Sequence, residues 1–195
     1  MIVEQFVMAY HVEQDRLRAM LPEGFTSLRP VLRLNAEIRT EDGGETLYLE
    51  FNTPAAFGDR RGWRNIARWE SPGDPLSYER NGKAVTFHSP FLTITFTDVG
   101  IGGGCPAERD NDGCFYSEAG FVPAERIDSD RAFCDCEFAW HFREGDARGK
   151  SIGKTLPAFL TDSEKTYPRL PLTAENAAAI PCDQVLGAYS VTFIR

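Results

Sequence analysis

The spacing of hydrophobic residues changes twice within the first forty residues. An apolar run covers residues 6–12, and the helical spacing that follows is formed by Leu17, Met20 and Leu21. Pro22 and Gly24 end that helix. From Val31 the period becomes two: Leu32, Leu34, Ala36 and Ile38 alternate with Arg33, Asn35, Glu37 and Arg39. This pattern predicts a strand, a short helix over residues 13–20 and a second strand.

The same two-residue alternation recurs along the rest of the chain. It is found in residues 46–51, 85–88, 92–97, 115–121, 133–143 and 184–194. Glycine-containing turn signals separate these segments, and Asn81-Gly82 fits a two-residue hairpin turn. Further helices are expected over residues 155–161 and 173–180, the latter with Thr173 as N-cap. The pattern indicates an α+β fold, mainly β: an antiparallel barrel with short flanking helices, as a single domain over residues 1–195.

Composition and charge exclude several functions. The formal net charge is −8, and no cluster of Lys and Arg is present, which argues against nucleic acid as a partner. No apolar run approaches the roughly 20 residues that span a bilayer, so no membrane partner is expected. The start of the chain has no basic segment ahead of an apolar one, so a secretory signal is not expected. Five cysteines, an odd number, favour reduced thiols in the cytoplasm.

The short motifs of the chain do not complete a cofactor or metal site. Residues 149–153 match G-x-S-x-G, but no histidine follows His141 to serve as the base of a hydrolase. The glycine-rich residues 100–104 do not complete G-x-G-x-x-G, and the acidic residues after them lack the spacing of a calcium loop. Cys134 and Cys136 are closer in sequence than the ligand pairs of structural zinc sites. We therefore expect no cofactor and no metal.

The two faces of the strand predicted over residues 133–143 differ in chemistry. One face carries Cys134, Cys136, Phe138, Trp140 and Phe142, and we interpret its cysteines as small buried hydrophobes. The other face carries Asp135, Glu137, His141 and Arg143. This second face is either a solvated outer surface or, if the sheet curls into a barrel with a polar interior, a site. Glu137 and His141 are then candidate catalytic residues, and Asp135 and Arg143 candidate substrate-binding residues.

Lys83 is the third candidate catalytic residue. It opens a predicted strand and is the only lysine outside residues 150–165. An exposed lysine is the ordinary interpretation of this position. A buried one could have a lowered pKa and form Schiff bases with carbonyl compounds.

Two segments resemble the acetoacetate decarboxylase-like superfamily. Residues 6–25, FVMAYHVEQDRLRAMLPEGF, resemble its opening strand, Tyr-containing turn, helix and Leu-Pro-x-Gly ending. Residues 153–168, GKTLPAFLTDSEKTYP, resemble a helix-containing segment of a branch that lacks decarboxylase activity, and the closing strand 184–193 is in the matching place. The resemblance implies a β-cone with a central cavity and short helices, often in an oligomer of identical chains.

The chain departs from this family at the catalytic lysine. The family's decarboxylases carry Gly-x-Pro-Lys-Lys, whereas no Pro-Lys pair occurs here, and the arginine that precedes their first strand has no counterpart. Our leading hypothesis is a protein that binds a small carboxylated or carbonyl compound in its cavity without Schiff-base decarboxylation. One alternative is a lyase or another acid–base enzyme acting on a small keto acid. Another is a structural or interaction protein whose interior is filled by side chains.

Overall fold

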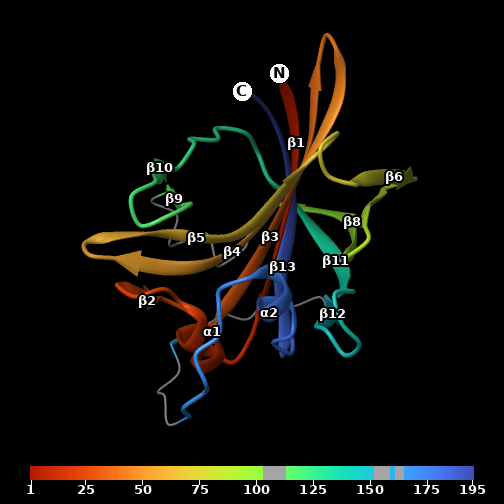
Figure 1. Cartoon of the computed structure of the whole chain (residues 1–195). Helices are drawn as coiled ribbons and strands as arrows, with labels where there is room; N and C mark the ends of the chain where they lie inside the picture. Colours follow the sequence, from red (N-terminus) through yellow and green to blue (C-terminus); the bar gives the residue numbers. More distant parts are fainter. Residues whose placement is uncertain (103–112, 152–158, 161–164) are drawn as a thin grey trace.

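The fold is one curled sheet with short helices at one end (Figure 1). The computed structural model describes residues 1–102, 113–151, 159–160 and 165–195. The helices are α1 (Gln14–Met20) and α2 (Ala174–Ala178). The strands are β1 (Ile2–His11), β2 (Phe25–Ser27), β3 (Val31–Glu41), β4 (Gly44–Phe57), β5 (Arg60–Glu70), β6 (Ser77–Asn81), β7 (Ala84–Ser89), β8 (Leu92–Gly102), β9 (Gly113–Phe115), β10 (Phe121–Pro123), β11 (Ala132–Trp140), β12 (Arg148–Lys150) and β13 (Gln184–Ile194).

The predicted mainly β class is confirmed, but the barrel is not closed. The strands follow the order β10-β9-β5-β4-β3-β1-β13-β11-β8-β7-β6, with β12 on β11 and β2 on β4. Among the described strands, all pairings are antiparallel except β5 with β9. The two end strands of this order, β10 and β6, do not pair with one another in the part of the chain that the structure describes.

The space enclosed by the curled sheet is a packed apolar core. Phe51 of β4 and Trp140 of β11 are four places apart in the strand order, yet their ring centroids lie 4.6 Å apart. Trp69 of β5 likewise lies 4.5 Å from Phe91, beside β8. The helices α1 and α2 contribute further buried residues to this cluster. The central cavity expected from the family resemblance is therefore not on this inner face, because side chains fill it.

The strand and helix predictions near the N-terminus are confirmed. The even-numbered residues 32–38 of β3 are buried in the inner core, as the alternation predicted. The helix over residues 13–20 is α1, and Thr173 caps α2 by accepting a hydrogen bond from the Asn176 amide. The helix predicted over residues 155–161 falls largely outside the described residues.

Four local predictions need correction. The hairpin turn between β6 and β7 consists of Gly82 and Lys83 rather than Asn81 and Gly82, because Asn81 still pairs with Ala84 and the positive φ of 62° is at Gly82. Lys83 therefore lies in an exposed turn and does not open a strand. Residues 115–121 form the ends of two short strands and a turn, not one strand. The strand predicted to reach residue 143 ends at Trp140.

Candidate functional site

A polar cavity of about 350 Å³ lies on the face of the sheet opposite the inner core. We call it the outer cavity. Its floor comes from β1, β3 and β4, and its walls come from β5, β9, β13 and residues 116–131. The floor residues include Gln5, Arg33, Asn35, Glu37, Tyr48 and Glu50.

Strand register places these floor residues in adjacent rows. Glu37 of β3 pairs with Gln5 of β1 on one side and with Tyr48 of β4 on the other. In the next row, Asn35 pairs with Val7 and Glu50. Arg33 follows in a third row, opposite Asn52. Directly opposed side chains in a sheet start about 4.5–5.5 Å apart, so these polar groups must interact.

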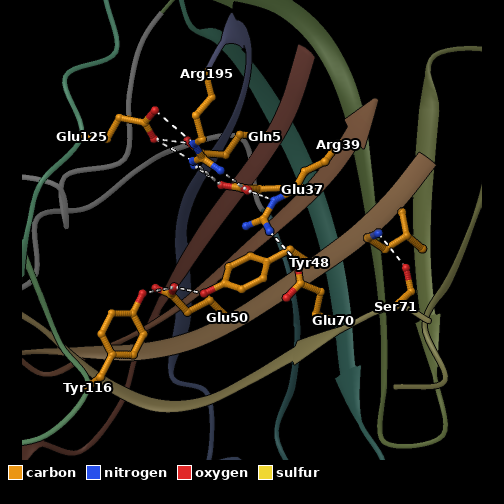
Figure 2. Close-up of polar contacts among 11 residues, drawn as sticks. Gln5, Glu37, Arg39, Tyr48, Glu50, Glu70, Ser71, Tyr116, Glu125 and Arg195 are labelled. Carbon is orange, nitrogen blue, oxygen red and sulfur yellow. Dashed lines mark hydrogen bonds and ion pairs between the residues drawn. The ribbon is translucent and has the colours of Figure 1, made fainter. Parts of the chain in front are cut away.

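Glu37 forms the first of two buried polar networks (Figure 2). Its side chain is 2 % exposed and accepts hydrogen bonds from Gln5 Nε2 at 3.0 Å, Arg39 Nε at 2.7 Å and Arg195 Nη1 at 3.1 Å. Burial alone would raise the pKa of this carboxyl, but the hydrogen bond from Arg195 and the charge of Arg39 outweigh burial. The pKa of Glu37 is therefore below its ordinary value, and the group is ionised at neutral pH.

Glu50 forms the second network, one row away. It accepts hydrogen bonds from the Tyr48 hydroxyl, from the Asn52 amide and from the Tyr116 hydroxyl, the last at 3.3 Å. Burial, and next to it the Glu50 charge, raise the pKa of both tyrosines. Both phenols thus keep their protons at neutral pH and donate to the carboxylate. Burial, followed by the same carboxylate, raises the pKa of the Cys114 thiol to about 12, so this thiol is not a nucleophile at neutral pH.

A third group of side chains lies around Arg33. The Arg33 guanidinium carbon is 4.8 Å from the centroid of the Trp63 ring. Two buried atoms beside it, Trp63 Nε1 and Asn35 Oδ1, have no hydrogen-bond partner among the described residues. Buried polar atoms of native proteins nearly always have a partner, so these two atoms indicate where a ligand can bind.

Arginine side chains connect the wall of the outer cavity to its floor and give the lining a positive charge. Arg195 bridges the floor and the wall, because it donates to Glu37 and, at 2.6 Å, to Glu125 (Figure 2). Arg131 lies over the Tyr189 ring, with 5.3 Å between its guanidinium carbon and the ring centroid. The lining carries four arginines and three glutamates, a formal charge of +1 when all are ionised. The outer cavity is therefore suited to a small anion.

Close contact of glycine backbones brings β9 to the cavity. A Cβ atom on Gly62 of β5 would lie 2.5 Å from the carbonyl oxygen of Gly113, which no real side chain tolerates. The parallel pairing of β5 with β9 therefore needs glycine at this position. It places Cys114 at the cavity and leads into Tyr116, which reaches Glu50.

The site residues predicted from sequence lie elsewhere. Glu137 is exposed, with its carboxylate 3.4 Å from Lys150 Nζ. Asp135 is half-buried on the same face of β11, opposite the buried Cys134 and Cys136. None of the four predicted residues on this strand is among the residues that line the outer cavity.

His141 and Arg143 lie beyond the end of β11, so they do not continue its alternation. His141 Nε2 is 3.3 Å from the Thr93 hydroxyl, and Arg143 donates to Glu175 at 2.8 Å. The structure does not bring these two together with Glu137 and Asp135 in a cavity. The catalytic and substrate-binding roles of the four residues stay predictions.

The described lysines also lie away from the outer cavity. Lys83 is exposed in its turn, Lys150 pairs with Glu137, and Lys165 donates to Glu13 at 2.7 Å. None of these three lines the cavity. Lys154 falls outside the described residues.

The alternation predicts only that Arg33, Asn35, Glu37 and Arg39 form the polar half of a strand. It does not mark them as a site. The signal that could have found the site is that the next strand is also amphipathic, with Tyr48 and Glu50 on its polar face. A short turn at residues 42–43 aligns the two polar faces, so that titratable groups of both strands become neighbours.

No group of three or more His, Cys, Asp or Glu side chains that could hold a metal ion occurs in the described ranges. Neither of the two described helices has the length and apolar character needed to cross a membrane.

The chain has the curled β-sheet fold of acetoacetate decarboxylase-like proteins, as the sequence resemblance predicted. An acetoacetate decarboxylase from Legionella pneumophila matches with a TM-score of 0.58 and 11 % identity, over 97 % of this chain and 80 % of that one. The enduracididine biosynthesis enzyme MppR, complexed with pyruvate, matches with a TM-score of 0.61 and 10 % identity, over 98 % and 84 %.

An acetoacetate decarboxylase-like enzyme from Sphingomonas wittichii matches with a TM-score of 0.56 and 12 % identity, over 98 % of this chain and 87 % of that one. No family model matches the chain, and no curated protein sequence does. At these identities the likeness establishes the fold alone, and the chemistry depends on the chain's own residues.

Proposed function

We propose that the outer cavity binds a small molecule bearing a carboxylate or carbonyl group, and that no Schiff-base lysine takes part. The observation that carries this proposal is the convergence of four arginines on a polar cavity whose lining has a formal charge of +1 when all groups are ionised. Arginine binds carboxylates through two parallel hydrogen bonds, which gives both affinity and orientation. The MppR structure, described as a complex with pyruvate, shows that one protein of this fold binds a small keto acid.

The ligand would bind at the Arg33 end of the outer cavity. Two buried atoms without a hydrogen-bond partner among the described residues, Trp63 Nε1 and Asn35 Oδ1, are found there. Arg33 lies beside the unpartnered Trp63 Nε1, so these two side chains together can donate to one carboxylate. The proposal places the anionic end of the ligand there.

We expect Arg33→Met to weaken binding of small carboxylates, pyruvate first, by roughly 10- to 100-fold, because a charge-assisted hydrogen bond is lost. Calorimetric titration measures the affinity. The matched control is Arg148→Met, since Arg148 is exposed on β12 and does not line the outer cavity. A covalent measurement accompanies the titration: borohydride added with pyruvate should leave the protein mass unchanged.

Two results would contradict the proposal. Equal loss of affinity in both variants would mean that the carboxylate does not bind at the outer cavity. A stoichiometric borohydride adduct on any lysine, Lys154 included, would mean that a Schiff base does form. Acetoacetate decarboxylase treated in parallel serves as the positive control for trapping.

The second candidate function is acid–base chemistry on a small keto acid, which the environment of Glu50 favours. A buried carboxylate with two protonated tyrosines at its Oε2 atom can accept a proton while a phenol donates to a developing oxyanion. In deuterated water the protein should then accelerate exchange of the pyruvate methyl protons, and Glu50→Gln should slow this exchange roughly 100-fold or more. Proton NMR follows the exchange. A wild-type rate equal to that of buffer rejects this candidate and leaves the binding proposal in place.

The oligomer of identical chains and the cytoplasmic location stay predictions. The proposed ligand binding depends on neither, because the outer cavity is formed by residues of one chain.

A further inference from the structure

Two polar atoms at the outer cavity are buried and unpartnered, and their chemistries are opposite. Asn35 is 6 % exposed and Trp63 is 2 % exposed, and both line the cavity. Asn35 Oδ1 can only accept a hydrogen bond, whereas Trp63 Nε1 can only donate one. Neither atom has a partner in the part of the chain that the structure describes.

The positions of the two side chains constrain what a ligand must carry. Trp63 lies under the Arg33 guanidinium, and Arg33 is two residues from Asn35 on the same face of β3. Side chains two residues apart on a strand start roughly 6.6 Å apart. A ligand that binds at this place therefore presents acceptor atoms to Arg33 and Trp63, and a hydrogen-bond donor, a short distance away, to Asn35.

We propose that the ligand of the outer cavity is a small 2-hydroxy acid, with its carboxylate at Arg33 and Trp63 Nε1 and its hydroxyl donating to Asn35 Oδ1. This inference rests on the proposed binding function and narrows its ligand class. A plain 2-keto acid has only acceptor atoms near its carboxylate, so it leaves Asn35 Oδ1 buried without a partner. A 2-amino acid supplies a donor, but as a zwitterion it leaves the +1 charge of the lining uncompensated.

Matched pairs of acids test this directly, because each pair differs only at the second carbon. The pairs are lactate and pyruvate, malate and oxaloacetate, and phenyllactate and phenylpyruvate, with alanine as the amino acid of the first pair. Calorimetric titration should show at least one hydroxy acid binding about fivefold or more tightly than its keto partner. Lactate should also bind more tightly than alanine.

Two variants distinguish the contributions of Asn35 Oδ1 and Trp63 Nε1 to ligand affinity. Asn35→Leu removes the acceptor at similar volume, so the hydroxy-to-keto affinity ratio should fall to within about twofold of one. Trp63→Phe keeps a ring under Arg33 but removes the N–H donor. This substitution should weaken the binding of both acids of a pair equally, by about fivefold or more, and leave the ratio of their affinities unchanged. The control is Gln14→Met, a buried amide bonded to Ser27 that lies outside the cavity lining and should leave every affinity unchanged.

The outcomes distinguish this inference from the proposal beneath it. If the keto acids bind as tightly as the hydroxy acids or more tightly, the inference is overturned and the binding proposal stands. If alanine binds more tightly than lactate, the donor is an ammonium group and the hydroxy-acid assignment is wrong. If no carboxylic acid binds the wild-type protein, both the hydroxy-acid inference and the binding proposal are wrong. The wild-type ratios decide these cases even if Asn35→Leu fails to fold.

Discussion

Trp140→Ala is expected to lower the free energy of unfolding by about 3–5 kcal/mol. Trp140 of β11 is 3 % exposed and packs across the inner core against β4, with its ring centroid 4.6 Å from that of Phe51. Its Nε1 also donates to the Tyr10 hydroxyl at 3.1 Å. The substitution removes the ring contact with Phe51 and this hydrogen bond, and it leaves a cavity in the inner core between β4 and β11. Denaturant unfolding followed by circular dichroism measures the effect.

A second variant at the same position tests which face of the sheet holds the ligand. Trp140→Phe keeps most of the ring volume and should cost only about 1–2 kcal/mol, from the hydrogen bond lost at Tyr10. Affinity for small carboxylates should be unchanged, because Trp140 does not line the outer cavity. Loss of binding by a folded Trp140→Phe protein would show that the ligand enters the inner core.

Glu37→Gln is expected to lower the free energy of unfolding by about 2–4 kcal/mol. The carboxylate is buried, and its loss removes the charge partner that Arg39 and Arg195 share. Breaking a fully buried pair costs about 3–5 kcal/mol, and the partial exposure of the two arginines reduces this figure. Chemical denaturation at pH 7 gives the difference, with Glu70→Gln as the control. Glu70 is an exposed partner of Arg39, so its replacement should cost less than about 1 kcal/mol.

The same carboxyl should make stability depend on acid pH. The folded-state pKa of Glu37 is lower than its ordinary value of about 4.3, so folding favours the ionised form. This contribution is complete above the ordinary pKa and is lost as the pH falls through the folded-state pKa. Wild-type stability should therefore fall more steeply than that of Glu37→Gln below about pH 4. Parallel acid-limb curves for the two proteins would contradict the assignment.

The candidate site shows how far alternation can predict function. The alternating pattern placed Arg33, Asn35 and Glu37 on one face of β3 and Leu34 on the other, and the structure confirms this division. Alternation also divided β11 correctly, with Cys134 and Cys136 buried. On both strands the titratable face could have been a site or a solvated surface. The pattern is the same in the two cases, so it could not select between them.

What the sequence by itself determined is much of the local structure and the class of fold: the strand–helix–strand opening, the cap of α2, and the residues of β3 and β11 that face the inner core. These follow from the geometry of the backbone, which repeats every two or every 3.6 residues. Only the tertiary structure decided which polar face is covered. The outer cavity exists because β9, residues 116–131 and Arg195 lie over β3 and β4, and Arg195 is 158 residues from its partner Glu37. Contacts over such separations depend on how the whole sheet curls, and no local pattern specifies them.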